Sequence, residues 1–526
     1  MPVSRWRVDG PALLSEQQYE GGPLGCDYTE GIDCRWPGRM VLGPLMTVLD
    51  CAAAGGTVAN TNGFAVAPVS MQAAGPFLYA IRGTKWAKIK ITAAAAALTL
   101  SSDDTEGALG EAATDIEYSR NAAGTEEIII GMDNTAARVI TTVGAGATDT
   151  DAAVTGNYKW RIIGLAGSVS AAREVACFGR GTGTPQNLAQ QVTLSTTVTL
   201  VTPTVTLRST MGGEPIVFTG FAMDGDFWIV GTSNGPYYID PNFNTFRPLI
   251  DELDQDNAHC GQMTTWSLLG PAVLIPLKRS TRISRNLSGE SVGPEMFAEN
   301  TSPIAGTMTA FCASDLWGYA AFYNPVSDVT YVCAVRPRGR NDWHQNALSY
   351  WPIAKLAAGI ESRAAYFVGT QATRTLPLVA FGYDDDIVTF DEGRDNRFTE
   401  DTSYNFAASG TWYGTTLTTA PNVWKSIKRV KFESEDCTEN SETITVSIVG
   451  TNRYGVEETV QVGGVVESNG WQVLHVREES PVIFRFPKPK VVMARGGTTT
   501  LSPKIVRGEL SIEWEPYDFD AEGRAM

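Results

Sequence analysis

The chain has 526 residues, of which 43% are hydrophobic and 19% are charged, and its formal net charge is −17. This composition indicates a folded protein and excludes extensive disorder, and the length exceeds what one hydrophobic core usually serves. The negative charge argues against a nucleic-acid-binding surface and against anionic membranes as partners, because both require Lys and Arg opposite phosphate groups.

Residues 1–70 read as an extended, turn-rich arm, since Gly, Pro, Asp and Arg dominate and no strand or helix period persists. The opening "MPVSRWRVDG" lacks the apolar run of a secretory signal. The longest apolar stretch, "ITAAAAALTL" from Ile91, is about half the ~20 residues that span a bilayer. We therefore expect neither a membrane-spanning segment nor export by the general route.

Residues 71–400 contain a recurring apolar–turn–apolar unit. Each copy has an apolar run, a break of Gly, Asn, Asp, Ser or Pro, and a second, alternating run, which is the pattern of a β-hairpin. The spacing of roughly 45–50 residues is typical of four-stranded propeller blades. Loop insertions rich in Ala, Thr and Gly are expected at about 93–157. The copies begin at Phe77, Glu126, Asp226, Ala272, Gly318 and Leu376.

Two further segments have a distinct local pattern. "QVTLSTTVTLVTPTVTLRST" from Gln191 alternates with period two and predicts a long strand or hairpin. "PIAKLAAGIES" from Pro352 is the best short helix candidate. Residues 401–526 carry short strand patterns separated by turn signals, which indicate a β-sandwich. The predicted fold class is all-β: a β-propeller with an N-terminal extended arm and a C-terminal β-sandwich.

The sequence contains no recognised catalytic motif. The three histidines, His259, His344 and His475, have no metal-binding spacing, and neither a GxSxG elbow nor a Walker A motif occurs. The Asp boxes of sialidase-type propellers and the marks of Kelch and WD repeats are missing as well. We predict no enzyme, no catalytic residue and no cofactor, although a Ser-His-Asp site stays open because its members are distant in sequence.

Two acidic segments are candidates for cation binding. The first resembles positions 1, 3, 5 and 12 of an EF-hand loop, but Thr245 stands where Gly is required, and its oxygen-bearing residues are Asp240, Asn242, Asn244 and Asp251. The second is a run of carboxylates in one hairpin, made of Asp384, Asp385, Asp386, Asp391 and Glu392. A solvated, charged turn is favoured for both segments, so no metal site is predicted.

The aromatic segment and the cysteines each have two possible roles. "NDWHQNALSYW", from Asn341 to Trp351, could stack on a sugar or close a blade, and the structural reading is favoured. The cysteines contain no CxxC and are expected to be reduced core residues of a protein assembled in cytoplasm, with a Cys26–Cys34 pair left open. They are Cys26, Cys34, Cys51, Cys177, Cys260, Cys312, Cys333 and Cys437.

Two parts of the sequence resemble bacteriophage tail-associated β-propeller proteins. "EGIDCRWPGRMVLGP" from Glu30 is similar to the segment that leads from the arm into the first blade. The run from Trp424 to Pro516 resembles the β-sandwich that follows the propeller in tail nozzle and minor tail proteins. The Ala/Thr-rich stretch between Ala93 and Asn157 departs from the pattern and leaves the blade number open. The matching sandwich residues are Lys428, Arg429, Gly470, Trp471, Ser502, Pro503, Glu513 and Trp514.

The resemblance implies a structural component of a phage virion tail, of the nozzle or hub type, in the genome-delivery or host-attachment apparatus and without catalysis. It implies assembly in the host cytoplasm, other phage tail proteins and further copies of the chain as partners, and a host surface receptor for a peripheral tail protein. An acidic ring wall would let DNA slide without sequence-specific binding. The alternatives are a propeller enzyme or lectin acting on cell-surface carbohydrate, and a bacterial cytoplasmic scaffold.

Overall fold

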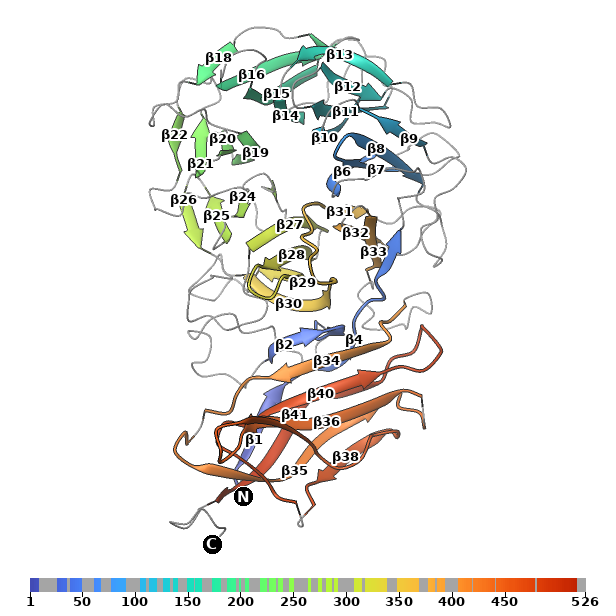
Figure 1. Cartoon of the computed structure of the whole chain (residues 1–526), viewed down its shortest axis with the longest axis vertical. Helices are drawn as coiled ribbons and strands as arrows, with labels where there is room; N and C mark the ends of the chain where they lie inside the picture. Colours follow the sequence, from blue (N-terminus) through green and yellow to red (C-terminus); the bar gives the residue numbers. More distant parts are fainter. Residues whose placement is uncertain are drawn as a thin grey trace.

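Every element of the described chain is a β-strand, and the strands form a ring of blades beside a two-sheet domain (Figure 1). No helix long and apolar enough to cross a membrane occurs among the described residues. The computed structural model describes residues 1–8, 26–49 except 36–37, and 405–517 except 419, 440 and 478–479; between 61 and 392 it describes the strands named below and short stretches beside them.

The ring is a β-propeller. Among the described strands, five four-stranded sheets and the two halves of a nine-stranded sheet make seven blades. The first blade has β6 (Thr61–Ala67), β7 (Phe77–Arg82), β8 (Lys85–Lys90) and β9 (Thr105–Ala108). The second has β10 (Ala113–Arg120), β11 (Glu126–Met132), β12 (Ala136–Ile140) and β13 (Asp149–Thr155). The third has β14 (Asn157–Ile162), β15 (Arg173–Arg180), β16 (Asn187–Leu194), β17 (Val198–Thr199) and β18 (Thr204–Leu207).

The remaining blades follow in chain order around the ring. The fourth has β19 (Phe218–Asp224), β20 (Phe227–Thr232), β21 (Gly235–Ile239) and β22 (Phe246–Pro248). The fifth has β23 (Thr264–Thr265), β24 (Val273–Pro276), β25 (Thr281–Arg285) and β26 (Ser288–Ser291). The sixth has β27 (Thr307–Ala313), β28 (Gly318–Asn324), β29 (Val329–Pro337) and β30 (Leu348–Lys355). The seventh has β31 (Ala365–Val368), β32 (Leu378–Tyr383), β33 (Asp386–Asp391) and, from before the first blade, β5 (Thr47–Leu49).

The seventh blade closes the ring by combining distant parts of the sequence. Strand β5 pairs antiparallel with β33, with Val48 opposite Val388. Strand β31 lies beside both β6 and β27, so the last blade joins the first. A blade made from both sides of the propeller sequence holds the ring closed through backbone hydrogen bonds.

The apolar runs that identified the hairpins lie inside the blades. Ile128–Ile130 on β11 and Val332–Val335 on β29 are fully buried. A strand that is covered on both faces by neighbouring blades reads as a continuous apolar run, whereas a half-exposed strand alternates. The predicted all-β propeller is confirmed.

Three local expectations can be compared with the strands. The period-two segment from Gln191 contains the end of β16 and all of β17 and β18. Both β17 and β18 pair antiparallel with β16, as expected for a hairpin. The helix expected from Pro352 is wrong: β30 runs through Lys355 and turns follow, because this segment pairs with β29. Where loop insertions were expected at about 93–157, the structure has a complete blade, β10–β13, held by the apolar β11.

The second part of the molecule consists of two antiparallel sheets. The seven-stranded sheet contains β3 (Ile32–Asp33), β4 (Arg39–Leu42), β41 (Lys504–Tyr517), β35 (Trp424–Glu435) and β38 (Gly470–His475) in this order, with β1 (Val3–Arg7) on β41 and β39 (Val482–Phe484) on β35. The five-stranded sheet contains β2 (Cys26–Glu30), β34 (Ser409–Gly414), β40 (Lys488–Ala494), β36 (Thr443–Thr451) and β37 (Glu457–Gln461).

The arm expected over residues 1–70 is a set of paired strands where the structure describes it. β1 pairs with β41, β2 with β34, and β4 with β41, so the N-terminal strands complete both sheets of the C-terminal domain. Trp6 is fully buried and donates from Nε1 to the carbonyl oxygen of Thr415 at 2.9 Å. The sequence showed no pattern here because the strands are short and their partners lie hundreds of residues away.

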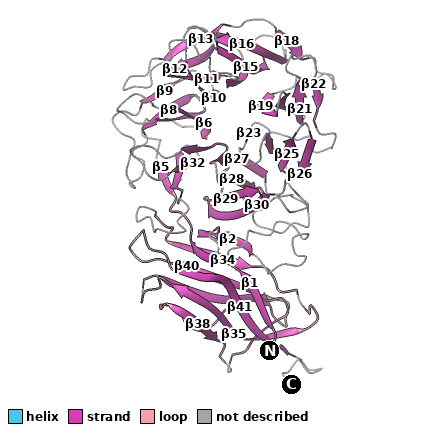
Figure 2. Ribbon diagram, turned by 180° about the vertical axis from the view of Figure 1, so that it is seen from behind, coloured by secondary structure: helices cyan, strands magenta, loops and turns pink. Residues whose placement is uncertain are grey.

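The propeller is therefore inserted into the sandwich between β4 and β34. The two connecting segments meet in a neck, where Pro44 and Phe406 form an antiparallel bridge. The amide of Leu45 donates to the carbonyl oxygen of Asn405, and that of Ala407 to Gly43, both at 2.8 Å. Seen from behind, the neck lies between the ring and the long strands of the sandwich (Figure 2).

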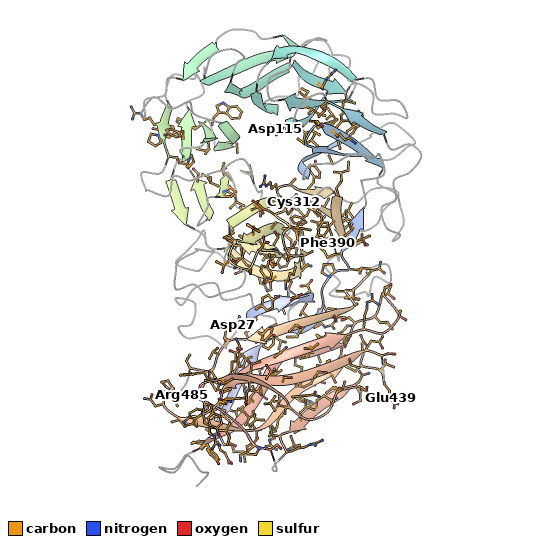
Figure 3. All side chains as sticks on the ribbon, viewed as in Figure 1. Asp27, Asp115, Cys312, Phe390, Glu439 and Arg485 are labelled. Atoms are coloured by element: carbon orange, nitrogen blue, oxygen red, sulfur yellow. The ribbon has the colours of Figure 1, made fainter. Side chains whose placement is uncertain are left out.

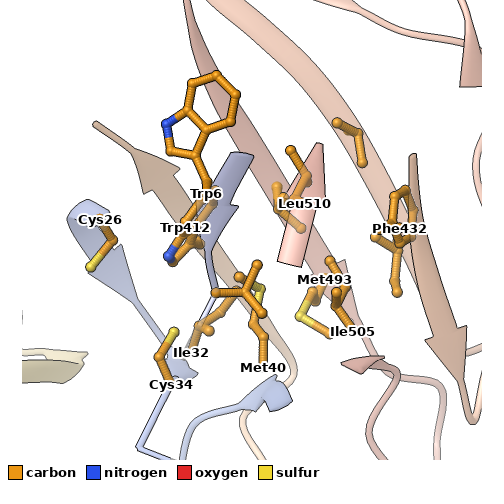
Figure 4. Close-up of a cluster of buried hydrophobic side chains, with 14 of the residues drawn as sticks. Trp6, Cys26, Ile32, Cys34, Met40, Trp412, Phe432, Met493, Ile505 and Leu510 are labelled. Atoms are coloured by element: carbon orange, nitrogen blue, oxygen red, sulfur yellow. The ribbon is translucent and has the colours of Figure 1, made fainter. Parts of the chain in front are cut away.

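One hydrophobic core extends from the sixth blade into the sandwich. It includes Phe322 and Tyr350 of the propeller together with Trp6 and Trp412 of the sandwich. Figure 4 shows the sandwich part, where Trp412 lies beside Cys26 and Ile32. Strand β2 lies along β30, and the ring of Tyr28 meets that of Tyr331 edge-on at 5.7 Å. The two parts are joined by packed side chains as well as by the chain.

Candidate functional site

Most residues of the two acidic segments lie outside those that the structure describes. Asp240, Asn242, Asn244 and Asp251 of the first segment lie outside them, as do Asp384, Asp385 and the side chain of Asp386 in the second. Asp391 ends β33, and Glu392 is buried. In the part of the chain described, no group of three His, Cys, Asp or Glu side chains could hold a metal ion.

The aromatic segment from Asn341 is described only at its end. Residues 341–347 lie outside the described part, so His344 has no structural account. Trp351 packs edge-on against Trp317, with ring centroids 5.3 Å apart, and Tyr350 packs in the same way against Phe322. These rings fill the space between strands, which is the structural role favoured from the sequence.

The cysteines of the described chain are buried thiols. Cys26, Cys34, Cys312, Cys333 and Cys437 form no disulfide, so the Cys26–Cys34 pair left open by the sequence is not made. Burial raises the pKa of the Cys26, Cys312 and Cys333 thiols above its usual range, and it raises that of Cys437 to about 11. The thiols are therefore protonated and poorly nucleophilic at neutral pH. Cys51, Cys177 and Cys260 lie outside the described residues.

A buried charged cluster lies where the N-terminal segment meets the sixth and seventh blades. Arg35 Nε donates to both carboxylate oxygens of Asp33 at 3.0 Å, and its Nη1 donates to the Tyr319 hydroxyl at 2.9 Å. The Tyr319 hydroxyl in turn donates to Glu392 Oε1. The guanidinium also lies over the Trp317 ring, 5.1 Å from its centroid. The cluster connects the segment after β3 to the start of β28 and the end of β33.

The electrostatics of this cluster indicate that it holds the N-terminal segment against the sixth and seventh blades. Burial raises the pKa of the Glu392 carboxyl, against the opposing effects of the Tyr319 hydrogen bond and the Arg35 charge. The folded state tolerates buried charged groups whose partners are all present, and removing one partner strongly destabilises the protein. The sequence placed Glu392 in an acidic turn and gave no sign of Arg35 as its neighbour, because the cluster joins residues more than 280 positions apart.

Residues that carry the sandwich resemblance gather on the outer face of the seven-stranded sheet. Glu513 on β41 forms ion pairs with both Arg429 and Lys431 on β35. The hydrogen bonds from Lys431 and then Arg429 lower the pKa of the Glu513 carboxyl. Lys428 Nζ lies 3.0 Å from Glu515 Oε2 on the same sheet. We call these five residues the charged face.

The other matching residues have structural contacts. The Ser502 hydroxyl accepts from the amide of Leu42 at 2.9 Å and thereby ties β4 to the start of β41. Trp514 is buried and donates from Nε1 to the Ser4 hydroxyl at 3.1 Å. Gly470 begins β38 with φ 102°, which glycine adopts readily. Trp471 follows it and is 62% exposed, with the Arg507 guanidinium 5.3 Å from its ring centroid.

The candidate functional site is therefore the charged face together with the neighbouring strand β38. It presents ion pairs and an exposed aromatic ring on the same sheet. Such a surface is suited to binding another protein surface, and it brings together no nucleophile with a base. His475, the histidine that the structure describes, is exposed on β38.

Comparisons with known proteins extend to fold only. No protein-family model and no curated protein matches the sequence. The chain is similar to the extracellular domain of the putative one component system BT4673 from B. thetaiotaomicron, at 8% identity and a TM-score of 0.44, over 85% of this chain and 60% of that one. It thus spans less than two thirds of that protein's length.

Two further solved structures match over about two thirds of this chain. The β-propeller domain of Cps50 (Swd1) from Myceliophteria thermophila is 13% identical with a TM-score of 0.39, over 66% of this chain and 99% of that one. The AfRom2 CNH domain is 12% identical with a TM-score of 0.36, over 67% and 100%. At these identities the similarity concerns the propeller fold, and no function is taken from it.

Proposed function

We propose that the protein is a structural component of a phage virion tail, of the nozzle or hub type, and that it works without catalysis. The observation that carries the proposal is the hydrophobic core shared by the sixth blade and the sandwich. A propeller and a sandwich joined by packed side chains act as one rigid body, as a load-bearing tail part requires. The resemblance of the segments from Glu30 and from Trp424 to tail proteins gives the proposal its context.

Composition and cysteine state support the same role. A tail protein assembles in a reducing cytoplasm and then persists outside the cell, so its stability cannot depend on disulfides. The described cysteines are buried and form no disulfide, and the net charge of −17 disfavours adhesion to a genome that passes nearby. Partners under this proposal are other tail proteins, further copies of the chain and, at the tail tip, a host receptor.

The proposal is tested on virus particles. Antibodies against the purified chain should label the tails of purified particles in electron micrographs, and peptides of the chain should be found in those particles by mass spectrometry. Particles that lack the chain, or labelling of the head alone, would overturn the proposal. Light scattering and negative-stain images of the purified chain then separate a ring around the tail axis from a peripheral subunit.

A function on carbohydrate is tested in parallel. A propeller lectin or glycosidase would bind or cleave cell-surface glycans, so the purified chain is applied to a glycan array and to labelled polysaccharide. Retention or cleavage that survives removal of the aromatic ring in Trp471→Ala would place the activity away from the candidate site. If the chain neither binds nor cleaves glycans, the carbohydrate function is rejected and the structural role remains.

A further inference from the structure

The buried cluster at the junction contains more negative than positive charge. Asp33 and Tyr319 are fully buried, and Arg35 and Glu392 are 8% and 6% exposed. The hydrogen-bonded groups are thus one guanidinium, one phenol and two carboxylates. A buried ion is strongly destabilising unless an opposite charge lies beside it. One guanidinium balances one carboxylate, so the second carboxylate is incompletely compensated when both are ionised.

Hydrogen bonds show which carboxylate the guanidinium balances. Arg35 Nε donates to both carboxylate oxygens of Asp33 at 3.0 Å, and Nη2 donates to Asp33 Oδ2 at 2.7 Å. Both residues belong to the N-terminal segment, so their charges cancel whether or not that segment lies against the propeller. Glu392 accepts a hydrogen bond from the Tyr319 hydroxyl, which is neutral.

The other ionisable groups around Glu392 do not supply a buried positive charge. Cys312 on β27 is a neutral thiol, because burial and then the Glu392 charge raise its pKa. Arg336 on β29 is exposed, so water screens its charge. Asp391, the preceding residue on β33, is also acidic. On β32, Tyr383 lies at the opposite end of the hairpin, where it pairs with Asp386.

We infer that Glu392 makes the contact between the N-terminal segment and the propeller sensitive to pH, closing it more firmly when the carboxyl is protonated. Separation leaves Asp33 with Arg35 on one side and Tyr319 with Glu392 on the other. It also admits water to Glu392, and an ionised carboxylate gains far more from hydration than a neutral carboxyl. The junction has this property whether or not the chain is a tail component.

The direction of the effect follows from the titration of Glu392. Burial raises its pKa above the usual value of about 4.3, the Tyr319 hydrogen bond and the Arg35 charge oppose the rise, and the Asp33 charge adds to it. The resulting stabilisation is therefore fully present below the unfolded pKa and is lost as the pH rises through the folded pKa. The contact should be firmer in mild acid than at neutral pH.

The first test compares the thermal stability of wild type and Glu392→Gln. The amide keeps the size of the side chain and its oxygen still accepts from Tyr319, but it has no charge. We expect Glu392→Gln to melt at a higher temperature than wild type at pH 8, and the difference to shrink towards pH 4.5. The matched control is Glu513→Gln, which should melt below wild type at pH 8, because the pKa of Glu513 is lowered.

The opposite result would overturn the inference. A Glu392→Gln variant that is less stable than wild type at pH 8 would mean that the ionised carboxylate stabilises the junction. A difference that is the same at pH 8 and at pH 4.5 would mean that the charge of Glu392 has no part in it.

Hydrogen exchange then locates the effect at the junction. The amide of Arg35 donates to Asp33 Oδ1, and that of Glu392 to the carbonyl oxygen of Pro377, both at 2.9 Å. Corrected for the intrinsic effect of pH, protection of peptides that contain these amides should fall at least about 3-fold from pH 4.5 to pH 8 in wild type. The fall should be absent in Glu392→Gln and in wild-type peptides of β36. An equal fall in both proteins would overturn the inference.

Tyr319→Phe tests the assignment to Glu392 without changing the carboxylate. It removes the hydrogen bond that lowers the pKa of Glu392, so the midpoint of the pH-dependent exchange should move to higher pH. A midpoint that stays in place or moves to lower pH would assign the titration to another group and overturn the inference.

Discussion

At the residue scale, glycines determine how closely the neck segments approach the sandwich. Gly31 has φ 64°, and a Cβ there would lie 2.7 Å from the carbonyl oxygen of Ser409. A Cβ on Gly43 would lie 2.6 Å from the carbonyl oxygen of Ile353 in the sixth blade. Both glycines belong to the segment that begins at Glu30, and each lies where a side chain would collide with a neighbouring backbone.

Gly410→Ala is expected to destabilise the protein by about 1–3 kcal/mol, since the added methyl group collides with the backbone of Gly31 and with Ile32. The control is Gly464→Ala, where nothing lies within 4 Å and the change should stay within about 0.5 kcal/mol. Urea unfolding of both variants measures the difference. Equal midpoints would contradict the close packing at the neck.

Glu513→Gln should lower stability at neutral pH, and the difference from wild type should vanish on acidification. The folded-state pKa of Glu513 is lowered by Lys431 and Arg429. Its stabilisation is therefore present above the unfolded pKa of about 4.3 and is lost as the pH falls through the lower folded value. Thermal melts at pH 7 and in acid test this. Glu515→Gln, which disrupts a half-exposed pair, should have little effect at either pH.

At the element scale, short strands with distant partners hold the molecule together. β1 completes the seven-stranded sheet and β5 completes the seventh blade, although both lie before the first blade in the chain. The Asp33, Arg35 and Glu392 cluster fixes the segment between them against the propeller. The local apolar pattern of the sequence identifies the blade strands. It does not identify β1 and β5, whose role depends on the distant strands with which they pair.

Trp6→Ala should destabilise the sandwich by about 3–5 kcal/mol, because it leaves a cavity under β1 and removes the hydrogen bond to Thr415. Arg5→Ala on the same strand should change little, because its pair with Glu509 is 3.8 Å long and more than half exposed. Chemical unfolding followed by tryptophan fluorescence and far-UV circular dichroism measures both. A neutral Trp6→Ala would mean that β1 is dispensable.

At the scale of the whole molecule, the propeller and the sandwich are joined into one body. Two connecting segments, a shared core and the charged cluster all lie at the junction with the sixth and seventh blades. Figure 3 shows Cys312 and Phe390 among the side chains of these blades, directly above the sandwich. Elements that pack in one contiguous apolar core tend to unfold as one cooperative unit.

The sandwich and the sixth blade should therefore unfold in one transition. Cys26 on β2 and Cys333 on β29 are fully buried, one on each side of the junction, and both thiols have a raised pKa. Pulse labelling of thiols across a urea series, mapped by mass spectrometry, should give the same midpoint at both sites. Cys333 becoming reactive at a lower urea concentration than Cys26 would show that the parts unfold separately.

The sequence alone determined the class of fold and many of the blade and sandwich strands. The runs at Ile128 and Val332 predicted buried blade strands, because side-chain burial on both faces requires an apolar residue at every position. The alternation in β38 predicted a half-buried strand by the same local rule. Acidic composition and the missing catalytic motifs were likewise readable without a structure.

Only the tertiary structure decided how these strands are connected and what the polar residues do. The N-terminal strands joined the sandwich and the last blade, a full blade stood where insertions were expected, and Glu392 turned inward to meet Tyr319 and Arg35. Hydrophobic periodicity reports which face of a strand is buried, within a few residues. It carries no information about which partner, hundreds of residues away, buries that face or supplies the opposite charge.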